Sequence, residues 1–237
     1  MPALLPILKR LSLRKVNKYG DTVHTTFDNF ISNLKLPAKS QALSVSTGDG
    51  VWDYSTFHVQ PQIKKIIATD IVKNPVAISD QKMLKQMGDW SFLQVKPEAQ
   101  LPFPDNTFNL VYHLDVIEHV QKPYSFLQDQ YQVLKKGGYL LVGTPNLHRP
   151  MNLVKILLGK LTFPVNIGDL GHLGSCVHVQ EFTQYQLKNM LEETGFKIVS
   201  ERSCFFGICP LNVQFQAFPK TDAGKNLCQY MIFLCQK

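Results

Sequence analysis

His119 and His178 are the side chains of this sequence best suited to acid–base chemistry. His119 directly follows Glu118, and His178 opens the run His178-Val179-Gln180-Glu181. The ordinary pKa of histidine lies near neutral pH, so an imidazole can take a proton from a hydroxyl group while its oxygen attacks. We expect His119 and His178 to be catalytic bases or substrate contacts. The competing interpretation is that both make only structural hydrogen bonds.

A second group of residues is suited to binding a nucleoside. The run Ser46-Thr47-Gly48-Asp49-Gly50 follows an apolar segment, and glycine in such a turn lets the backbone approach a ligand closely. Asp70 ends the next apolar segment, 20 residues after Gly50. A carboxylate at that place can accept hydrogen bonds from both hydroxyls of a ribose.

The charge of this loop indicates which nucleoside it would bind. A dinucleotide site needs the pattern G-x-G-x-x-G, whereas this loop carries glycine only at Gly48 and Gly50. Asp49 would also place a negative charge beside a pyrophosphate, which costs Coulomb energy. S-adenosylmethionine has no phosphate and carries a cationic sulfonium. The loop therefore favours S-adenosylmethionine over NAD.

The elements that must position these residues alternate between strand-like apolar runs and helical stretches. This alternation predicts an α/β domain with a doubly wound, mainly parallel sheet, in which ligands bind at the carboxyl edge. The expected strands cover residues 42–45, 65–69, 92–95, 108–114, 139–144, 198–199 and 230–235.

Helix-end signals mark two of the helices. Pro123 suits a first turn, and Gly137-Gly138 is expected to end that helix. Thr183 and Gln186 form a capping box for the second helix, which Gly195 closes. Residues 147–177, which lie between the two helices, contain prolines, glycines and apolar patches. We interpret them as a lid inserted after the fifth strand, over the carboxyl edge of the sheet.

Five further motifs follow one another in a characteristic order. They are 101–111, Asp115-Val116-Ile117-Glu118-His119-Val120, 133–140, Thr144-Pro145-Asn146 and 178–183. In order and spacing they resemble class I S-adenosylmethionine-dependent methyltransferases, specifically the small-molecule group often called type 11. The resemblance covers roughly residues 40 to 200.

The resemblance implies a Rossmann-like, seven-stranded sheet whose last strand is antiparallel. It also implies that the cofactor is S-adenosyl-L-methionine, with the loop from Ser46 to Gly50 around the methionine part and Asp70 on the ribose. Glu98 and Ala99 should pass beside the adenine, and Asp115 should lie near the methyl-bearing sulfur.

Three positions depart from the pattern of that family. Ser44 stands where the family usually has an acid, Ser46 replaces the first loop glycine, and no acid stands near Pro97. These departures leave open that the chain is an inactive, methyltransferase-like subunit that acts by docking a partner.

A metal site is the next alternative. Asp115, Glu118, His119 and His178 resemble the divalent-ion site of some relatives that methylate catechols or RNA ends. Much of the same motif occurs in relatives with no assigned metal, and we expect no metal here.

Composition excludes several classes of protein. The chain has 237 residues, 44% of them hydrophobic, and no apolar run approaches the roughly 18 residues that cross a bilayer. No secretory signal is visible, and the five cysteines form no C-x-x-C pair. We therefore expect a cytoplasmic protein without a disulfide framework or a zinc knuckle.

The formal net charge of +7 is concentrated near the start of the chain. We divide the chain into an N-terminal basic helical segment, residues 1–40, and one methyltransferase domain, residues 41–237. The basic segment, interleaved with leucines, could touch an anionic membrane or simply pack on the domain. No nucleic-acid-binding motif is visible, and we expect no specific nucleic acid as a partner.

Together these features predict an S-adenosylmethionine-dependent methyltransferase of a small molecule. The expected reaction is O-methylation in the biosynthesis of a sugar, lipid, quinone or natural product. A nucleic-acid methyltransferase is the other alternative that the positive charge leaves open. Against it, Asp115-Val116-Ile117-Glu118 occupies the place of the Asn-Pro-Pro-Tyr type of motif used in base methylation.

Overall fold

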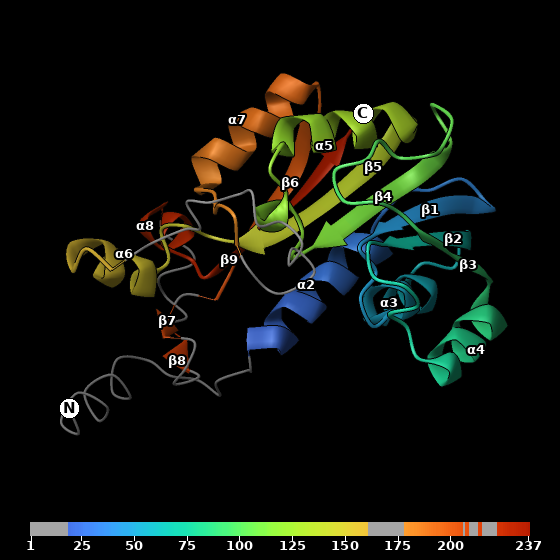
Figure 1. Cartoon of the computed structure of the whole chain (residues 1–237), viewed down its shortest axis with the longest axis horizontal. Helices are drawn as coiled ribbons and strands as arrows, with labels where there is room; N and C mark the ends of the chain where they lie inside the picture. The colour runs from blue at the N-terminus through green and yellow to red at the C-terminus, as the bar shows by residue number, and fades with distance from the viewer. Residues whose placement is uncertain (1–18, 161–177, 206, 209–212, 215–221) are drawn as a thin grey trace.

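A seven-stranded sheet organises the described part of the chain (Figure 1). The structure is a computed structural model, and it describes residues 19–160, 178–205, 207–208, 213–214 and 222–237. The strand order is β3-β2-β1-β4-β5-β9-β6. The strands are β1 (Ser40–Val45), β2 (Ile63–Asp70), β3 (Asp89–Gln94), β4 (Phe108–Leu114), β5 (Leu134–Pro145), β6 (Lys197–Cys204) and β9 (Tyr230–Gln236).

The strand directions confirm the expected Rossmann-like architecture. Strands β1 to β5 pair in parallel, and β9 pairs antiparallel with both β5 and β6. The order changes direction at β1, because β2 and β3 lie on one side of it and β4 on the other. In open α/β sheets such a switch point places a crevice at the carboxyl ends of the strands.

Helices cover both faces of this sheet (Figure 1). On one face lie α2 (Tyr19–Ser32), α3 (Val51–Val59) and α4 (Ile78–Met87), and on the other lie α5 (Pro123–Val133) and α7 (Gln184–Thr194). The remaining elements are short: η1 (Ile117–His119), α6 (Pro150–Leu157), α8 (Asp222–Asn226) and the pair β7 (Gly207–Ile208) and β8 (Val213–Gln214).

The central strands are buried on both faces, and their period-two alternation divides the core. Along β4, Leu110 and Tyr112 pack under α2 and α3, while Val111 packs in the cluster that contains α5 and α7. A strand covered on both faces by helices must be apolar almost throughout, as β4 is. Helices on both faces hold β4 in place, and the position of β4 determines where the strand ends at the edge of the sheet.

The two predicted helix ends have different outcomes. The capping box of α7 is present as predicted: Gln186 N donates to Thr183 Oγ1, Gln186 Oε1 accepts from Thr183 N, and Gly195 follows at φ 105°. In contrast, α5 ends at Val133, not at Gly137-Gly138. Leu134 already pairs with Phe108 of β4, so the chain enters β5 before it reaches the glycines.

The N-terminal segment and the lid are described only in part. Residues 1–18 and 161–177, which belong to these two predicted segments, lie outside the described residues. Residues 19–32 form α2, whose Val23, Phe27 and Ile31 are buried in the core. Among the helices that the structure describes, none is long and apolar enough to cross a membrane.

The packing of α2 against the core predicts how much Phe27 contributes to the free energy of unfolding. Phe27 is fully buried and its ring lies 4.7 Å from Trp52 and 5.7 Å from Tyr112, centroid to centroid. Phe27→Ala should lower the free energy of unfolding by about 3–5 kcal/mol, because the cavity it leaves loses these contacts. Asn29→Ala, on the exposed side of α2, is the matched control and should change it by less than about 0.5 kcal/mol. Urea unfolding measures both, and a loss below about 1 kcal/mol for Phe27→Ala would show that α2 is not part of the cooperative core.

Candidate functional site

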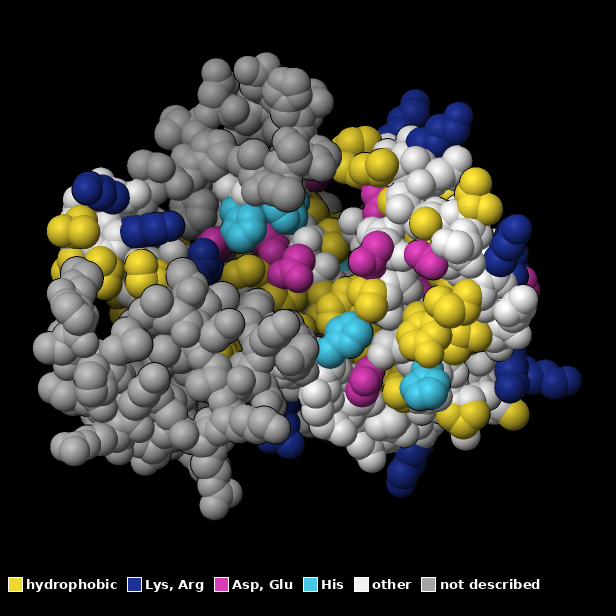
Figure 2. All heavy atoms as spheres, turned by 90° about the horizontal axis from the view of Figure 1, so that it is seen from below, with side chains coloured by type: hydrophobic (Ala, Val, Ile, Leu, Met, Phe, Trp, Pro, Cys, Tyr) yellow, Lys and Arg dark blue, Asp and Glu magenta, His cyan; other side chains and the backbone are white. Residues whose placement is uncertain are grey.

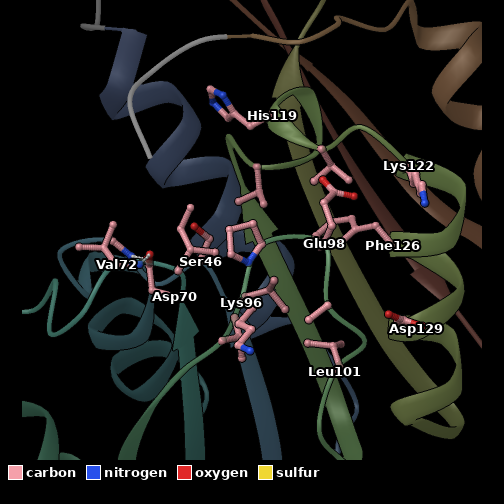
Figure 3. Close-up of a pocket in the computed structure, with 18 of the residues that line it drawn as sticks. Ser46, Asp70, Val72, Lys96, Glu98, Leu101, His119, Lys122, Phe126 and Asp129 are labelled. Carbon is pink, nitrogen blue, oxygen red and sulfur yellow. Dashed lines mark hydrogen bonds between the residues drawn. The ribbon is translucent and has the colours of Figure 1, made fainter. Parts of the chain in front are cut away.

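A cavity of about 500 Å³ opens at the carboxyl ends of β1, β2 and β4 (Figure 3). Ser46 and Asp70 lie on one side of it, and Phe126 and Asp129 of α5 lie on the other, with His119 at the upper end (Figure 3). A volume of this size suits a small-molecule ligand. The site therefore forms at the switch point of the sheet.

Asp70, at the end of β2, is held by backbone donors. Its Oδ2 accepts from Gly48 N at 3.1 Å and its Oδ1 from Val72 N at 2.9 Å, and the side chain lines the cavity. A carboxylate has about four acceptor positions, so two further donors can bind. The geometry thus offers an acceptor pair of fixed orientation, as the ribose interpretation requires.

The loop after β1 divides its residues between lining the cavity and holding its own shape. Ser46 and Gly48 line the cavity, with φ of 58° and 56°, and a Cβ on Gly48 would meet no atom within 4 Å. Thr47 is buried, Asp49 Oδ1 caps Val51 N, and Gly50 has φ 86° before α3. Thr47, Asp49 and Gly50 are therefore not among the residues that line the cavity.

Asp53 on α3 is the buried anchor of this loop. Its Oδ2 accepts from Thr47 Oγ1 and Trp90 Nε1, and its Oδ1 accepts from Tyr112 OH, each at 2.8 Å. Burial raises the pKa of the Asp53 carboxyl, and hydrogen bonds from Ser44 and these three donors act in the opposite direction. Our sequence reasoning missed Asp53, although an acid in the first turn after Gly50 among aromatic residues was a usable signal.

The segment 95–101 closes the cavity on the α5 side. Glu98 and Ala99 both line it, as does Pro97. Glu98 has φ 57°, and its Oε1 accepts from Gln121 N at 3.0 Å, which joins this segment to the loop before α5. Glu98 and Ala99 therefore border the same cavity as Asp70.

Asp115 lies just past β4 in a strained backbone conformation, and the residue is exposed. Its φ of 56° is unusual for a residue other than glycine, and its side chain lines the cavity. Asp115 N donates to Gly143 O of β5 at 3.0 Å, which holds the strained turn. Desolvation by the surrounding protein atoms raises the pKa of Asp115, and a hydrogen bond from Tyr230 and the charge of His178 act in the opposite direction.

The two predicted imidazoles meet at one end of the cavity. His119, at the end of η1, lines the cavity, whereas His178 does not. Their ring centroids are 5.0 Å apart and the rings are nearly perpendicular, at 85°. The fold thus brings together two histidines that are 59 residues apart in the sequence. Figure 2 shows a face of the molecule on which histidine and acidic side chains lie close together.

Glu118 completes this group as a buried carboxyl. Its Oε2 accepts from Thr144 Oγ1 at 2.8 Å, and its Oε1 has no hydrogen-bond partner among the described residues. Burial, with a contribution from the Asp115 charge, raises the pKa of Glu118 to about 7. The sequence offered Glu118 only as a possible metal ligand and did not indicate its burial, because the neighbours that bury it come from other strands.

Among the residues that the structure describes, a divalent ion would fit between Glu118, His119 and His178. Single ligand atoms of Glu118, His119 and His178 lie within 4.8 Å of one another, and Asp115 is not part of the set. One carboxylate and two imidazoles form a donor set that several divalent metals accept. Our expectation of a metal-free site stays a prediction, and elemental analysis of the purified protein would test it.

The pKa of Glu118 predicts a pH-dependent stability. The Glu118 carboxyl keeps its proton in the folded state up to about pH 7, but in the unfolded chain it would lose the proton near the ordinary glutamate pKa of 4.5. Wild-type stability should therefore fall as pH rises from about 4.5 to 7. Glu118→Gln has no proton to lose, so it should gain stability relative to wild type across this window, by about 1–3 kcal/mol above pH 7. Urea unfolding at both ends of the window measures the gain, and a pH-independent difference would contradict the assignment.

Comparisons with known proteins agree with this geometry. A family profile described as a methyltransferase domain matches residues 14–201. The demethylmenaquinone methyltransferase of Bacteroides fragilis is 27% identical over 193 residues, which cover 76% of this chain and 77% of that protein. The ubiquinone/menaquinone biosynthesis C-methyltransferase UbiE of Photorhabdus laumondii is 27% identical over 186 residues, 73% of this chain and 72% of that protein.

A solved structure shows the same fold at lower identity. The S-adenosylmethionine-dependent methyltransferase of Aquifex aeolicus superposes with a TM-score of 0.56 at 15% identity, covering 97% of this chain and 96% of that one. The family profile spans well over half of the chain. The chain therefore belongs to the methyltransferase-domain family and is an S-adenosyl-L-methionine-dependent methyltransferase.

Proposed function

We propose that this enzyme methylates an oxygen atom of a small molecule, in the biosynthesis of a sugar, lipid, quinone or natural product. The observation that carries the proposal is the pair of imidazoles formed by His119, which lines the cavity, and His178, whose ring centroid lies 5.0 Å from that of His119. An oxygen acceptor must lose its proton as it is methylated, and an imidazole beside the acceptor can take that proton. Positioning of the acceptor in line with the methyl group supplies much of the remaining rate enhancement.

The lining of the cavity fits a cationic nucleoside. Its carboxylates outnumber its lysines: Asp70, Glu98, Asp115 and Asp129 stand against Lys96 and Lys122. This charge favours a sulfonium over a pyrophosphate. When bound, S-adenosylmethionine supplies an electrophilic methyl group on a positively charged sulfur.

We assign the binding roles residue by residue. Asp70 would accept the ribose hydroxyls, Glu98 and Ala99 would flank the adenine, and Asp115 would lie near the sulfonium. The loop from Ser46 to Gly50 would surround the methionine part, with Ser46 and Gly48 in contact and Thr47, Asp49 and Gly50 holding the loop in shape.

A quinone-like phenol is the acceptor class that the relatives support. Two relatives are named for menaquinone or ubiquinone biosynthesis. One of those names also specifies a C-methyltransferase, so a carbon acceptor is the second candidate. The two candidates differ in the proton that leaves the acceptor: O-methylation releases the hydroxyl proton, which His119 or His178 would take, whereas C-methylation releases a proton from the ring carbon.

We further propose a cytoplasmic enzyme that contacts an anionic membrane through its basic N-terminal segment, and that binds no specific nucleic acid. Support comes from the sequence, where five cationic residues precede the first acidic residue, Asp21. These are Lys9, Arg10, Arg14, Lys15 and Lys18. Such a segment would bring the cavity near a lipid-soluble acceptor.

Removing the Asp70 carboxylate should abolish most of the affinity for the cofactor. Asp70→Ala loses the proposed ribose contacts and the bond to Gly48 N, so its dissociation constant for S-adenosylmethionine should rise about 10- to 100-fold or more. Asp80→Ala, a half-buried acid of α4 that does not line the cavity, is the control and should bind like wild type. Calorimetric titration with S-adenosylmethionine and S-adenosylhomocysteine measures both. Equal affinities for Asp70→Ala and wild type would refute the assigned site, and no binding by wild type would favour the partner-docking subunit.

The role of the imidazoles can be tested on a panel of acceptors. His119→Gln and His178→Gln should lower kcat for a catechol or a naphthoquinol by about 10²- to 10⁴-fold, because the hydroxyl proton has no acceptor. Neither change should alter the affinity for S-adenosylmethionine. His58→Gln, whose ring stacks on Tyr54 on the exposed side of α3, is the control. Mass spectrometry of the product separates a methoxy group from a ring methyl, and a ring methyl with full activity in both variants would select the carbon acceptor.

A further inference from the structure

We propose that Glu181 is a positioning residue, which holds the ring of His178 in one orientation and one tautomer. Its contacts with Arg149 and Asn152 also connect His178 to the start of α6. This inference deepens the proposed function, since it rests on the role of His178 as a base. Nothing in the residue pattern around Glu181 indicated such a role, because its partners come from a distant part of the chain.

The Glu181 carboxylate is buried and all of its acceptor positions are used. Its Oε1 accepts from Arg149 Nη2 and faces His178 Nδ1, both at 2.7 Å. Its Oε2 accepts from Arg149 Nη1 at 2.5 Å and from Asn152 Nδ2 at 2.7 Å. Only 8% of Glu181 is exposed. A carboxylate with four contacts from three side chains cannot rotate without breaking several of them.

These contacts keep Glu181 ionised. Burial by itself would raise its pKa, but the hydrogen bonds from His178, Arg149 and Asn152 lower the pKa of Glu181 to about 2. The two-point contact with Arg149 is the geometry in which a guanidinium binds a carboxylate most specifically. Glu181 therefore presents a fixed negative charge to the imidazole.

A fixed carboxylate at Nδ1 determines what the other ring nitrogen can do. An ionised carboxylate only accepts hydrogen bonds, so Nδ1 of His178 must carry a proton. In the neutral ring Nε2 then has a free electron pair, which is the form that a general base needs. Without the carboxylate the ring would be free to exchange this tautomer for the one with the proton on Nε2. Glu181 thus selects the tautomer of His178 that accepts a proton at Nε2.

The same carboxylate joins the base to α6. Asn152 is the one buried side chain that α6 contributes, and Arg149 is the residue just before its first turn. Next to Glu181, Phe182 forms a bridge with Asn146, and Leu147 N donates to Phe182 O at 2.9 Å. The backbone directly after Glu181 is therefore paired with the segment that leads into α6. The position of His178 relative to His119 depends on this junction.

Nuclear magnetic resonance of the full chain, with ¹⁵N-labelled histidine, can read the tautomer directly. At a pH well above the pKa of His178, long-range ¹H–¹⁵N spectra distinguish a protonated Nδ1 from a protonated Nε2, and His178→Gln identifies the signal by its absence. Wild type should show the proton on Nδ1. Glu181→Gln should shift the population toward Nε2, because an amide does not impose one tautomer.

Activity on the oxygen acceptor should follow the tautomer. In Glu181→Gln, kcat should fall by at least about tenfold, as for other histidines held in the wrong tautomer, while affinity for S-adenosylmethionine stays unchanged. Glu193→Gln, an exposed acid of α7, is the matched control and should leave both the spectrum and kcat as in wild type. Glu181→Asp keeps the charge with a shorter reach and should give a mixture of tautomers, so it serves if the Gln variant does not fold.

Two results separate this inference from the proposed function. An unchanged His178 tautomer in both Glu181→Gln and Glu181→Asp would overturn the positioning role. A changed tautomer together with full activity of His178→Gln would instead retain the positioning of the ring and remove His178 as the base.

Discussion

The buried carboxylate of Asp53 receives hydrogen bonds from three elements that meet beneath the cavity. Its donors are Thr47 in the loop after β1, Trp90 on β3 and Tyr112 on β4. Burying an ionised carboxylate costs several kcal/mol of desolvation unless such donors offset it. The loop, the sheet and α3 are therefore tied to one position, because a shift of any of them leaves a buried polar group without its partner.

The geometry of the cavity wall at Gly48 and Asp70 follows from that constraint. Once Thr47 is fixed, Gly48 can donate to Asp70, and the carboxylate of Asp70 is oriented by backbone groups alone. The opposite end, at η1, is built differently, around the buried carboxyl of Glu118 with the exposed Asp115 nearby. Asp115 and Glu118 both have raised pKa values there, and His119 and His178 lie beside them. One end is thus preorganised to bind, and the other holds groups that exchange protons near neutral pH.

Parts of the fold and of the site could be predicted because their signals are local. Alternating apolar runs predicted the sheet, and the capping box at Thr183 predicted the start of α7. The spacing from the glycine loop to Asp70 predicted one side of the cavity. The end of α5 was predicted wrongly at Gly137-Gly138, because pairing of Leu134 with β4 overrides a local glycine signal. Asp53 and Glu181 were missed, and the burial of Glu118 was not foreseen, since these features come from partners far away in the sequence.

By itself, the sequence determined the class of fold and the family of the enzyme, because hydrophobic period and motif order are properties of the chain read in one dimension. It also supplied His119 and His178 as candidates. Only the tertiary structure decided that these two rings are in contact, and that His119 lines the cavity whereas His178 does not. Proximity, burial and the choice of hydrogen-bond partner determine what an ionisable side chain can do. Those quantities arise when β4, β5 and the segment before α7 converge at one edge of the sheet.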